Sequence, residues 1–146
     1  MELVHEIDLA AYLLGNPQGP IHSIVSTVSD ATVDSSDIAD IIYKTINSGI
    51  VSIHMDYLYR GYSRHFLIGT KKANLHCDLF ENTIKITGDQ NQLLSSFKFE
   101  DFKRNDMYID LLEDYMKSLT HTAYQSRLPS FFTNESVMNT CFQINN

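Results

Sequence analysis

Two residues near the amino terminus have side chains that could transfer protons. His5 and Asp8 are three positions apart in a segment with helical periodicity, so they lie on one face of a helix. Imidazole exchanges protons near neutral pH, and a neighbouring carboxylate can orient the ring toward a substrate hydroxyl. The alternative is a surface histidine in a weak i, i+3 contact, and by spacing alone that ordinary arrangement is the commoner one.

A second group lies in the middle of the chain. Arg60, Tyr62 and Arg64 are close together at a bend marked by Gly61. Two guanidinium groups and a phenol could bind a polar or anionic ligand, so all three are candidate substrate-binding residues. Equally, they are solvated side chains that flank a turn.

Several kinds of site have no signature in this sequence. The glycines stand at 15, 19, 49, 61, 69 and 88, so no pair has the G-x-G spacing of a phosphate-binding loop, and we predict no cofactor-binding residues. Six histidines and two cysteines show neither C-x-x-C nor H-E-x-x-H spacing, and we predict no metal site.

Composition narrows the possible partners and the location. The chain has 146 residues and a net charge of −7, with no basic stripe, which argues against nucleic acid and against an anionic membrane surface. No apolar run approaches the roughly 20 residues that a membrane helix needs. With two isolated cysteines and no visible secretory signal, the sequence predicts a cytoplasmic protein.

The hydrophobic pattern predicts helices at both ends of the chain. In the segment 3–15, Val4, Ile7, Ala11 and Leu14 form a buried stripe, and Gly15 ends the helix. A second helix is expected after a cap at Asn105 or Asp106. It has an apolar stripe and a wet face, the latter made of Asp110, Glu113, Asp114 and Lys117. A last helix is expected after Thr133 or Asn134, with Val137, Met138, Cys141 and Phe142 inward.

Between the helices, short β-branched segments predict strands. We expect them at 21–28, 38–46, 50–59, 64–68, 74–79, 83–87 and 93–99. Asn47-Ser48-Gly49 has the composition of a hairpin turn. Strands joined by turns rather than helices predict an α+β domain: an open, mostly antiparallel sheet of six to seven strands, with helices covering one face. The other face is semi-apolar, so we expect a homo-oligomer through this sheet face.

The segment from Leu3 to Gly15, with its His5-Glu6-Ile7-Asp8 core, resembles the H-E-[IL]-D…L-G helix of the Gfo/Idh/MocA oxidoreductases. The likeness extends over nearly the whole chain, in the same order and with similar spacing. Its other segments are 37–59, 62–69 with Asp78, 105–108 and 134–142.

The resemblance implies a specific role. Members of that family pair a Rossmann domain that binds NAD or NADP with a C-terminal α+β domain that holds substrate and mediates oligomers. Residues 1–146 would be this C-terminal substrate-binding and oligomerisation domain, with the Rossmann domain of the same parent protein as its partner. The family's glycine loop and its Glu-Lys-Pro lysine are absent, and Met1 would then be either an artificial boundary within a longer protein or an internal start.

By this resemblance, His5 matches the family's active-site histidine and assists proton transfer. Asp8, Arg60, Tyr62 and Arg64 would contact a sugar or cyclitol, while hydride passes to or from NAD(P). The isolated chain would bind no cofactor and be inactive. Two alternatives stay open: a free-standing binding or assembly module that has lost the catalytic domain, and an unrelated α+β ligand-binding fold.

Overall fold

The computed structural model describes residues 3–29, 36–121, 123–126 and 131–144. Within these, the chain divides into two compact units, one made of residues 1–60 and 128–146, the other of residues 61–127. The first unit contains these elements: α1 (Leu3–Leu14), β1 (Pro17–Ser26), β2 (Ile38–Thr45), β3 (Ile50–Asp56) and α3 (Phe131–Ile144). The second contains these: β4 (His65–Gly69), β5 (Asn74–Asp78), β6 (Thr83–Thr87), the 3₁₀ turn η1 (Asp89–Asn91), β7 (Leu93–Lys98) and α2 (Arg104–Thr120).

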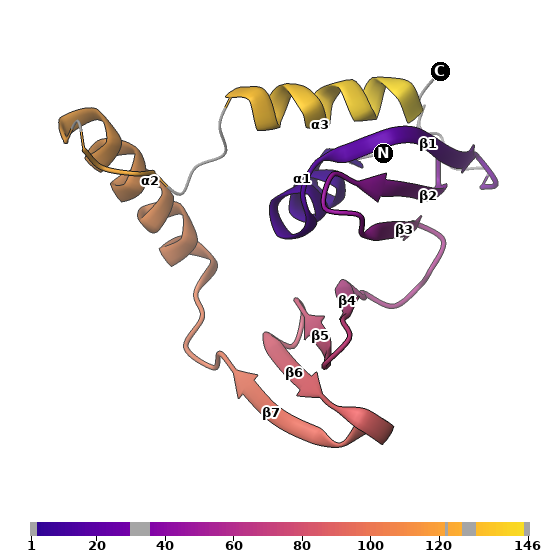
Figure 1. Ribbon diagram of the computed structural model, residues 1–146, viewed down its shortest axis with the longest axis horizontal. Helices are drawn as coiled ribbons and strands as arrows, with labels where there is room; N and C mark the ends of the chain where they lie inside the picture. The colour runs from indigo at the N-terminus through magenta and orange to yellow at the C-terminus, as the bar shows by residue number, and fades with distance from the viewer. Residues whose placement is uncertain (1–2, 30–35, 122, 127–130, 145–146) are drawn as a thin grey trace. The chain divides into compact units, whose positions relative to one another are not determined.

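The predicted α+β class and the strand order are confirmed, but the single sheet is wrong. All described strand pairs are antiparallel, and they form a three-stranded sheet, β1-β2-β3, and a four-stranded sheet, β4-β5-β6-β7 (Figure 1). The break falls at residues 57–64, which contain no strand. A two- or three-residue turn fixes the pairing of the strands it joins, whereas this longer connection does not, so the sequence pattern could not reveal the division.

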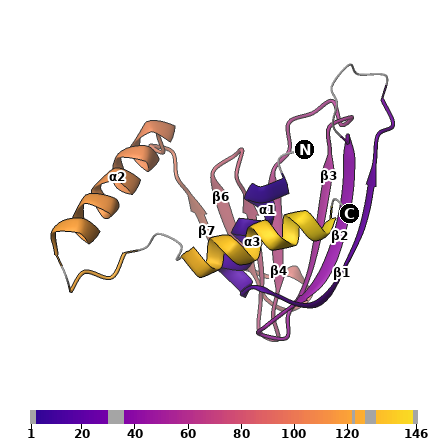
Figure 2. The ribbon, with the colours of Figure 1, turned by 90° about the horizontal axis from the view of Figure 1, so that it is seen from above.

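Sheet β1-β2-β3 has one buried face and one exposed face. Ala39, Ile41, Tyr43 and Thr45 alternate inward along β2, as the period-2 pattern predicts. Helices α1 and α3 cover this inner face and lie beside each other (Figure 1 and Figure 2). The core also contains Ile7 and Ala11 of α1, with Val4 and Leu14 packed at its edge, which confirms the predicted stripe of α1.

Helix α3 begins and packs differently from the prediction. It starts at Phe131, before the expected caps at Thr133 and Asn134. Val137 is buried and Cys141 is half-buried as expected, but the inward placement of Met138 and Phe142 is wrong because both are exposed. Their places in the core are taken by Thr140 and Ile144; the Thr140 hydroxyl donates to the Ser136 carbonyl (2.9 Å), which satisfies its polar group.

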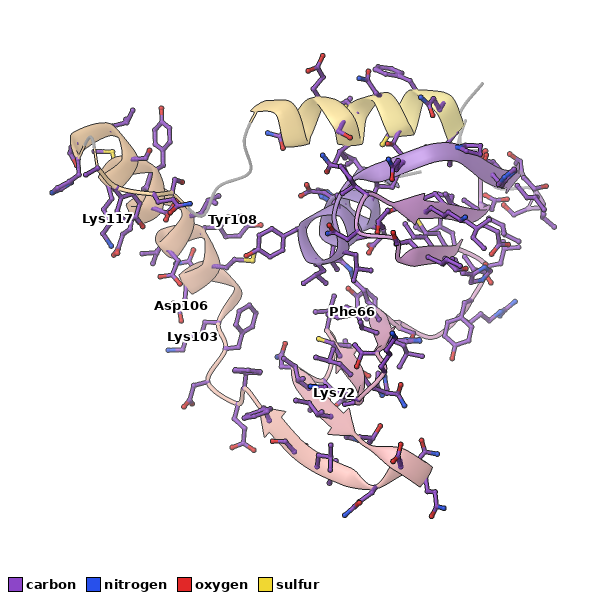
Figure 3. All side chains as sticks on the ribbon, in the orientation of Figure 1. Phe66, Lys72, Lys103, Asp106, Tyr108 and Lys117 are labelled. Carbon is purple, nitrogen blue, oxygen red and sulfur yellow. The ribbon has the colours of Figure 1, made fainter. Side chains whose placement is uncertain are left out.

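Helix α2 also differs from its prediction in two respects. It starts at Arg104 with Lys103 at the N-cap position, two residues before Asn105 and three before Asp106, and Lys103 makes no side-chain cap hydrogen bond. Asp114, expected on the wet face, is only 2% exposed, because the Tyr124 and Ser126 hydroxyls donate hydrogen bonds to its two carboxylate oxygens. The predicted apolar stripe of α2 is largely exposed. Side chains of this helix project in several directions, as Asp106, Tyr108 and Lys117 do in Figure 3.

Among the described residues, no helix combines the length and the apolar character needed to cross a bilayer.

Candidate functional site

His5 lies in the first turn of α1, and its side chain is exposed. The apolar stripe of α1 faces the sheet, so the helix presents His5 on its opposite side, together with the exposed Tyr12. An exposed imidazole is accessible to a molecule in solution. Its role in proton transfer stays a prediction.

Asp8 is half-buried one turn after His5. No hydrogen bond joins the two side chains in the described part of α1. The carboxylate does not orient the imidazole in this structure, and its role as the partner of His5 stays a prediction. Asp8 remains close enough along the helix face to contact the same ligand.

The end of α1 is fixed by the hairpin between β2 and β3. Asn47 Nδ2 donates to the Leu14 carbonyl (3.0 Å), and the Ile46 amide donates to the Asn16 carbonyl (2.9 Å). Gly15 has φ +92°, and a Cβ there would lie 2.7 Å from Asn47 Nδ2. A glycine in the left-handed conformation thus lets the hairpin satisfy a free carbonyl at the helix end and hold the helix that carries His5.

Arg60, Tyr62 and Arg64 do not all belong to one unit. Arg60 ends the first unit, whereas Tyr62 and Arg64 belong to the second, and all three side chains are exposed. The Tyr62 ring packs on Phe80 with ring centroids 5.2 Å apart. The Arg64 carbonyl accepts a hydrogen bond from the Leu79 amide (2.9 Å), which tethers the bend to the strand end. Their assignment to substrate binding stays a prediction.

Two further groups of polar side chains were missed by the sequence analysis. His54 Nδ1 is 2.8 Å from Asp40 Oδ1 on the exposed face of β2-β3. The sequence contained a signal for the pair of Asp40 and His54. Residues equally far before and after Asn47, at the centre of the hairpin turn, lie opposite each other in the two strands. On the second sheet, the rings of His65 and His76 meet edge to face with centroids 5.7 Å apart.

Asp78 lies beside this histidine pair, opposite His65 in the strand register. Its Oδ1 accepts the amides of Glu81 and Phe80, both at 2.9 Å. These backbone bonds, and to a smaller extent the charges of His76 and His65, hold the pKa of Asp78 below its usual value. The bonds also turn the carboxylate toward the 79–82 turn. Within the described residues, no group of three or more histidine, cysteine or acidic side chains is arranged to hold a metal ion.

The fold is shared with solved oxidoreductases. Levoglucosan dehydrogenase, in complex with NADH and levoglucosan, superposes with a TM-score of 0.82 at 16% identity, over 99% of this chain and 46% of that one. UDP-N-acetylglucosamine 3-dehydrogenase from Acidithiobacillus ferrooxidans gives 0.77 at 18% identity, over 99% and 44%. An oxidoreductase from Agrobacterium radiobacter, in complex with NAD+, L-tartaric acid and magnesium, gives 0.71 at 11% identity, over 94% and 43%.

The chain thus spans less than half the length of these solved structures. No family model and no curated protein matches the sequence.

Proposed function

We propose that this chain is the C-terminal substrate-binding domain of an NAD(P)-dependent oxidoreductase of the Gfo/Idh/MocA type, acting on a sugar or cyclitol. The observation that carries the proposal is the shared fold over 94–99% of the chain with enzymes whose structures contain NAD+ or NADH or that act on sugars. Those chains are more than twice as long, which leaves room in them for a second domain. The exposed His5, in its His-Glu-Ile-Asp segment, adds a side chain that can transfer a proton.

The described strands are antiparallel, so they do not form the parallel β-α-β unit with a glycine-rich turn that binds a dinucleotide in Rossmann domains. NAD(P) would supply a hydride acceptor or donor from a Rossmann domain of the same parent protein.

In this reaction, the chain's own residues bind the substrate and move a proton. His5 takes the proton from the substrate hydroxyl when the alcohol is oxidised, and returns it in the reverse direction. Asp8, Arg60, Tyr62 and Arg64 supply carboxylate, guanidinium and phenol groups that can hydrogen-bond other hydroxyls of a sugar.

The first test is the reading frame upstream of Met1. An in-frame Rossmann sequence supports the oxidoreductase, whereas a stop codon and promoter directly upstream support a free-standing binding or assembly module. In the intact parent enzyme, we expect His5→Ala to lower kcat by about 10²-fold or more, with KM for NAD(P) unchanged. An unchanged kcat would mean that His5 is an ordinary surface residue with no role in proton transfer.

The isolated chain gives a second test by calorimetry with NADH and NADPH. We expect no heat of binding for either. Micromolar affinity would contradict the proposal that a separate Rossmann domain binds the nucleotide, because it would mean that the chain contains its own nucleotide site.

A further inference from the structure

A groove of about 390 Å³ lies between β1 and α3, away from His5. Its strand side is formed by Pro17, Gly19 and Ile21, alternate residues of β1. None of the described residues of α1 lines it, so it is separate from the proposed proton-transfer site. Its volume falls at the small end of the range for ligand pockets in proteins, roughly 300–1,000 Å³.

The helix side of the groove is polar. Glu135, Ser136, Asn139 and Gln143 present a carboxylate, a hydroxyl and two amides from one side of α3. The carboxylate only accepts hydrogen bonds, whereas the hydroxyl and the amides both donate and accept. This mixture matches a ligand whose own groups donate and accept at the same atom, as alcohol hydroxyls do.

The charge of the lining excludes other ligand classes. Among the described residues, no lysine, arginine or histidine lines the groove, so a phosphate or carboxylate ligand would find no cation there to pair with. Glu135 is the charged residue among the described residues of the lining, and a single carboxylate is too few for a calcium site, which takes six to eight oxygen ligands. A neutral polar molecule fits the mixture of donors and acceptors that these residues present.

The strand side adds apolar surface and accessible backbone. Pro17 and Ile21 are half-buried and can contact the C–H faces of a ring. In the register with β2, Gln18 pairs with Lys44 and His22 pairs with Ile42, so residues 19–21 form an irregularity without paired positions. Strand β1 is an edge of its sheet, and a Cβ built at Gly19 would meet nothing within 4 Å. The groove is therefore open above Gly19, where backbone groups can be reached.

We propose that the β1–α3 groove binds a neutral polyhydroxylated molecule of monosaccharide size. The hydroxyls hydrogen-bond to Glu135, Asn139 and Gln143, and the ring packs on Pro17 and Ile21. This site is independent of the proposed oxidoreductase function, because it shares no lining residue with the α1 face that carries His5.

The test is amide chemical-shift mapping of the full 146-residue chain, with glucose, myo-inositol and levoglucosan as probes and inorganic phosphate as the anionic comparison. We expect at least one neutral probe to shift the amides of Gly19, Ile21, Ser136 and Asn139 in a saturable manner, and phosphate to leave them unchanged. Asn139→Ala and Glu135→Gln should each weaken binding by about tenfold.

Asn134→Ala is the matched control, since Asn134 is exposed on the same helix but does not line the groove. It should bind like the unchanged chain, and circular dichroism should give all three variants the same helix content. The proposal is overturned if no neutral probe shifts these amides up to high millimolar concentration. Shifts centred on α1 would overturn it too, as would equal effects of Asn139→Ala and Asn134→Ala. Because none of these readouts involves NAD(P) or turnover, its failure would leave the proposed function untouched.

Discussion

Tyr43 places a hydroxyl in the core of the first unit without a hydrogen-bond partner among the described residues. The residue is 2% exposed, and burial raises the pKa of its phenol to about 12. A buried polar group that lacks a partner reduces stability relative to an apolar group of the same shape. Replacing Tyr43 with an apolar residue of the same shape should therefore stabilise the folded state.

We expect Tyr43→Phe to raise the free energy of unfolding by about 1 kcal/mol at neutral pH, measured by urea denaturation. The pH dependence has a defined sign. Below about pH 10 the phenol is neutral in both states; as the pH rises toward 12, the unfolded chain ionises first, and stability falls. Tyr43→Phe should reduce that alkaline loss and remove the last tyrosinate to appear in an absorbance titration.

Tyr59→Phe is the control for this prediction, because Tyr59 is exposed. It should leave the neutral-pH stability unchanged within about 0.5 kcal/mol. A loss of stability in Tyr43→Phe would contradict the expectation and indicate that a water or another group satisfies the hydroxyl in solution.

The junction between α1 and the β2-β3 hairpin depends on one glycine. Gly15 and Gly19 both have left-handed φ values, +92° and +82°, but only at Gly15 would a Cβ meet a close neighbour, Asn47 Nδ2 at 2.7 Å. The two positions thus separate the cost of backbone strain from the cost of displacing the side chain that caps α1.

We expect Gly19→Ala to lower the free energy of unfolding by about 1 kcal/mol from backbone strain alone, and Gly15→Ala to lower it by about 2–3 kcal/mol. Urea denaturation monitored by circular dichroism measures both. In an Asn47→Ala background, the cost of Gly15→Ala should fall toward that of Gly19→Ala, because the obstructing amide is gone and only the contact with Ile46 Cγ2 at 3.0 Å remains. Equal costs in the unchanged background would show that the hairpin does not hold α1.

The hydrophobic pattern predicted burial correctly where a single strand or helix period determines which side chains face inward. Inward and outward residues of β2 follow strict alternation, and the stripe of α1 follows helical spacing. The pattern was wrong where a buried polar group is satisfied by a hydrogen bond that hydrophobic spacing does not reveal. Thr140 is buried because it bonds within its own helix, and Asp114 is buried because Tyr124 and Ser126, ten and twelve residues later, donate to it.

The candidate site was predictable only in part. The sequence predicted which face of α1 carries His5, because the apolar stripe determines the opposite face. It could not predict that Asn47 caps that helix, since the contact joins residues 33 positions apart and a turn composition explains Asn47 equally well. The grouping of Arg60 with Tyr62 and Arg64 relied on closeness in sequence, but a boundary between units falls between them.

At the scale of the whole molecule, the outer face of β1-β2-β3 is a surface on which a partner could pack. Helices α1 and α3 cover only the inner face. On the outer face, Ile24 pairs with Asp40 and Ile42 lies between His22 and Ser52, while Ile50 extends the same face along β3. All three isoleucines are exposed, at 72%, 46% and 69%. These exposed apolar side chains, set among polar neighbours, are what an interface on this face would bury.

We therefore expect the chain to associate through this face, and light scattering should give a dimer or a larger assembly at micromolar concentrations. Ile42→Lys places a charge at the centre of the surface and should weaken association by about tenfold or more, since a charge buried without a partner is costly. Tyr12→Lys is the control: Tyr12 is exposed on α1, which packs on the inner face, and its substitution should leave the assembly intact. A monomer at high concentration, or equal weakening by both substitutions, would mean that the outer face is solvated in this chain.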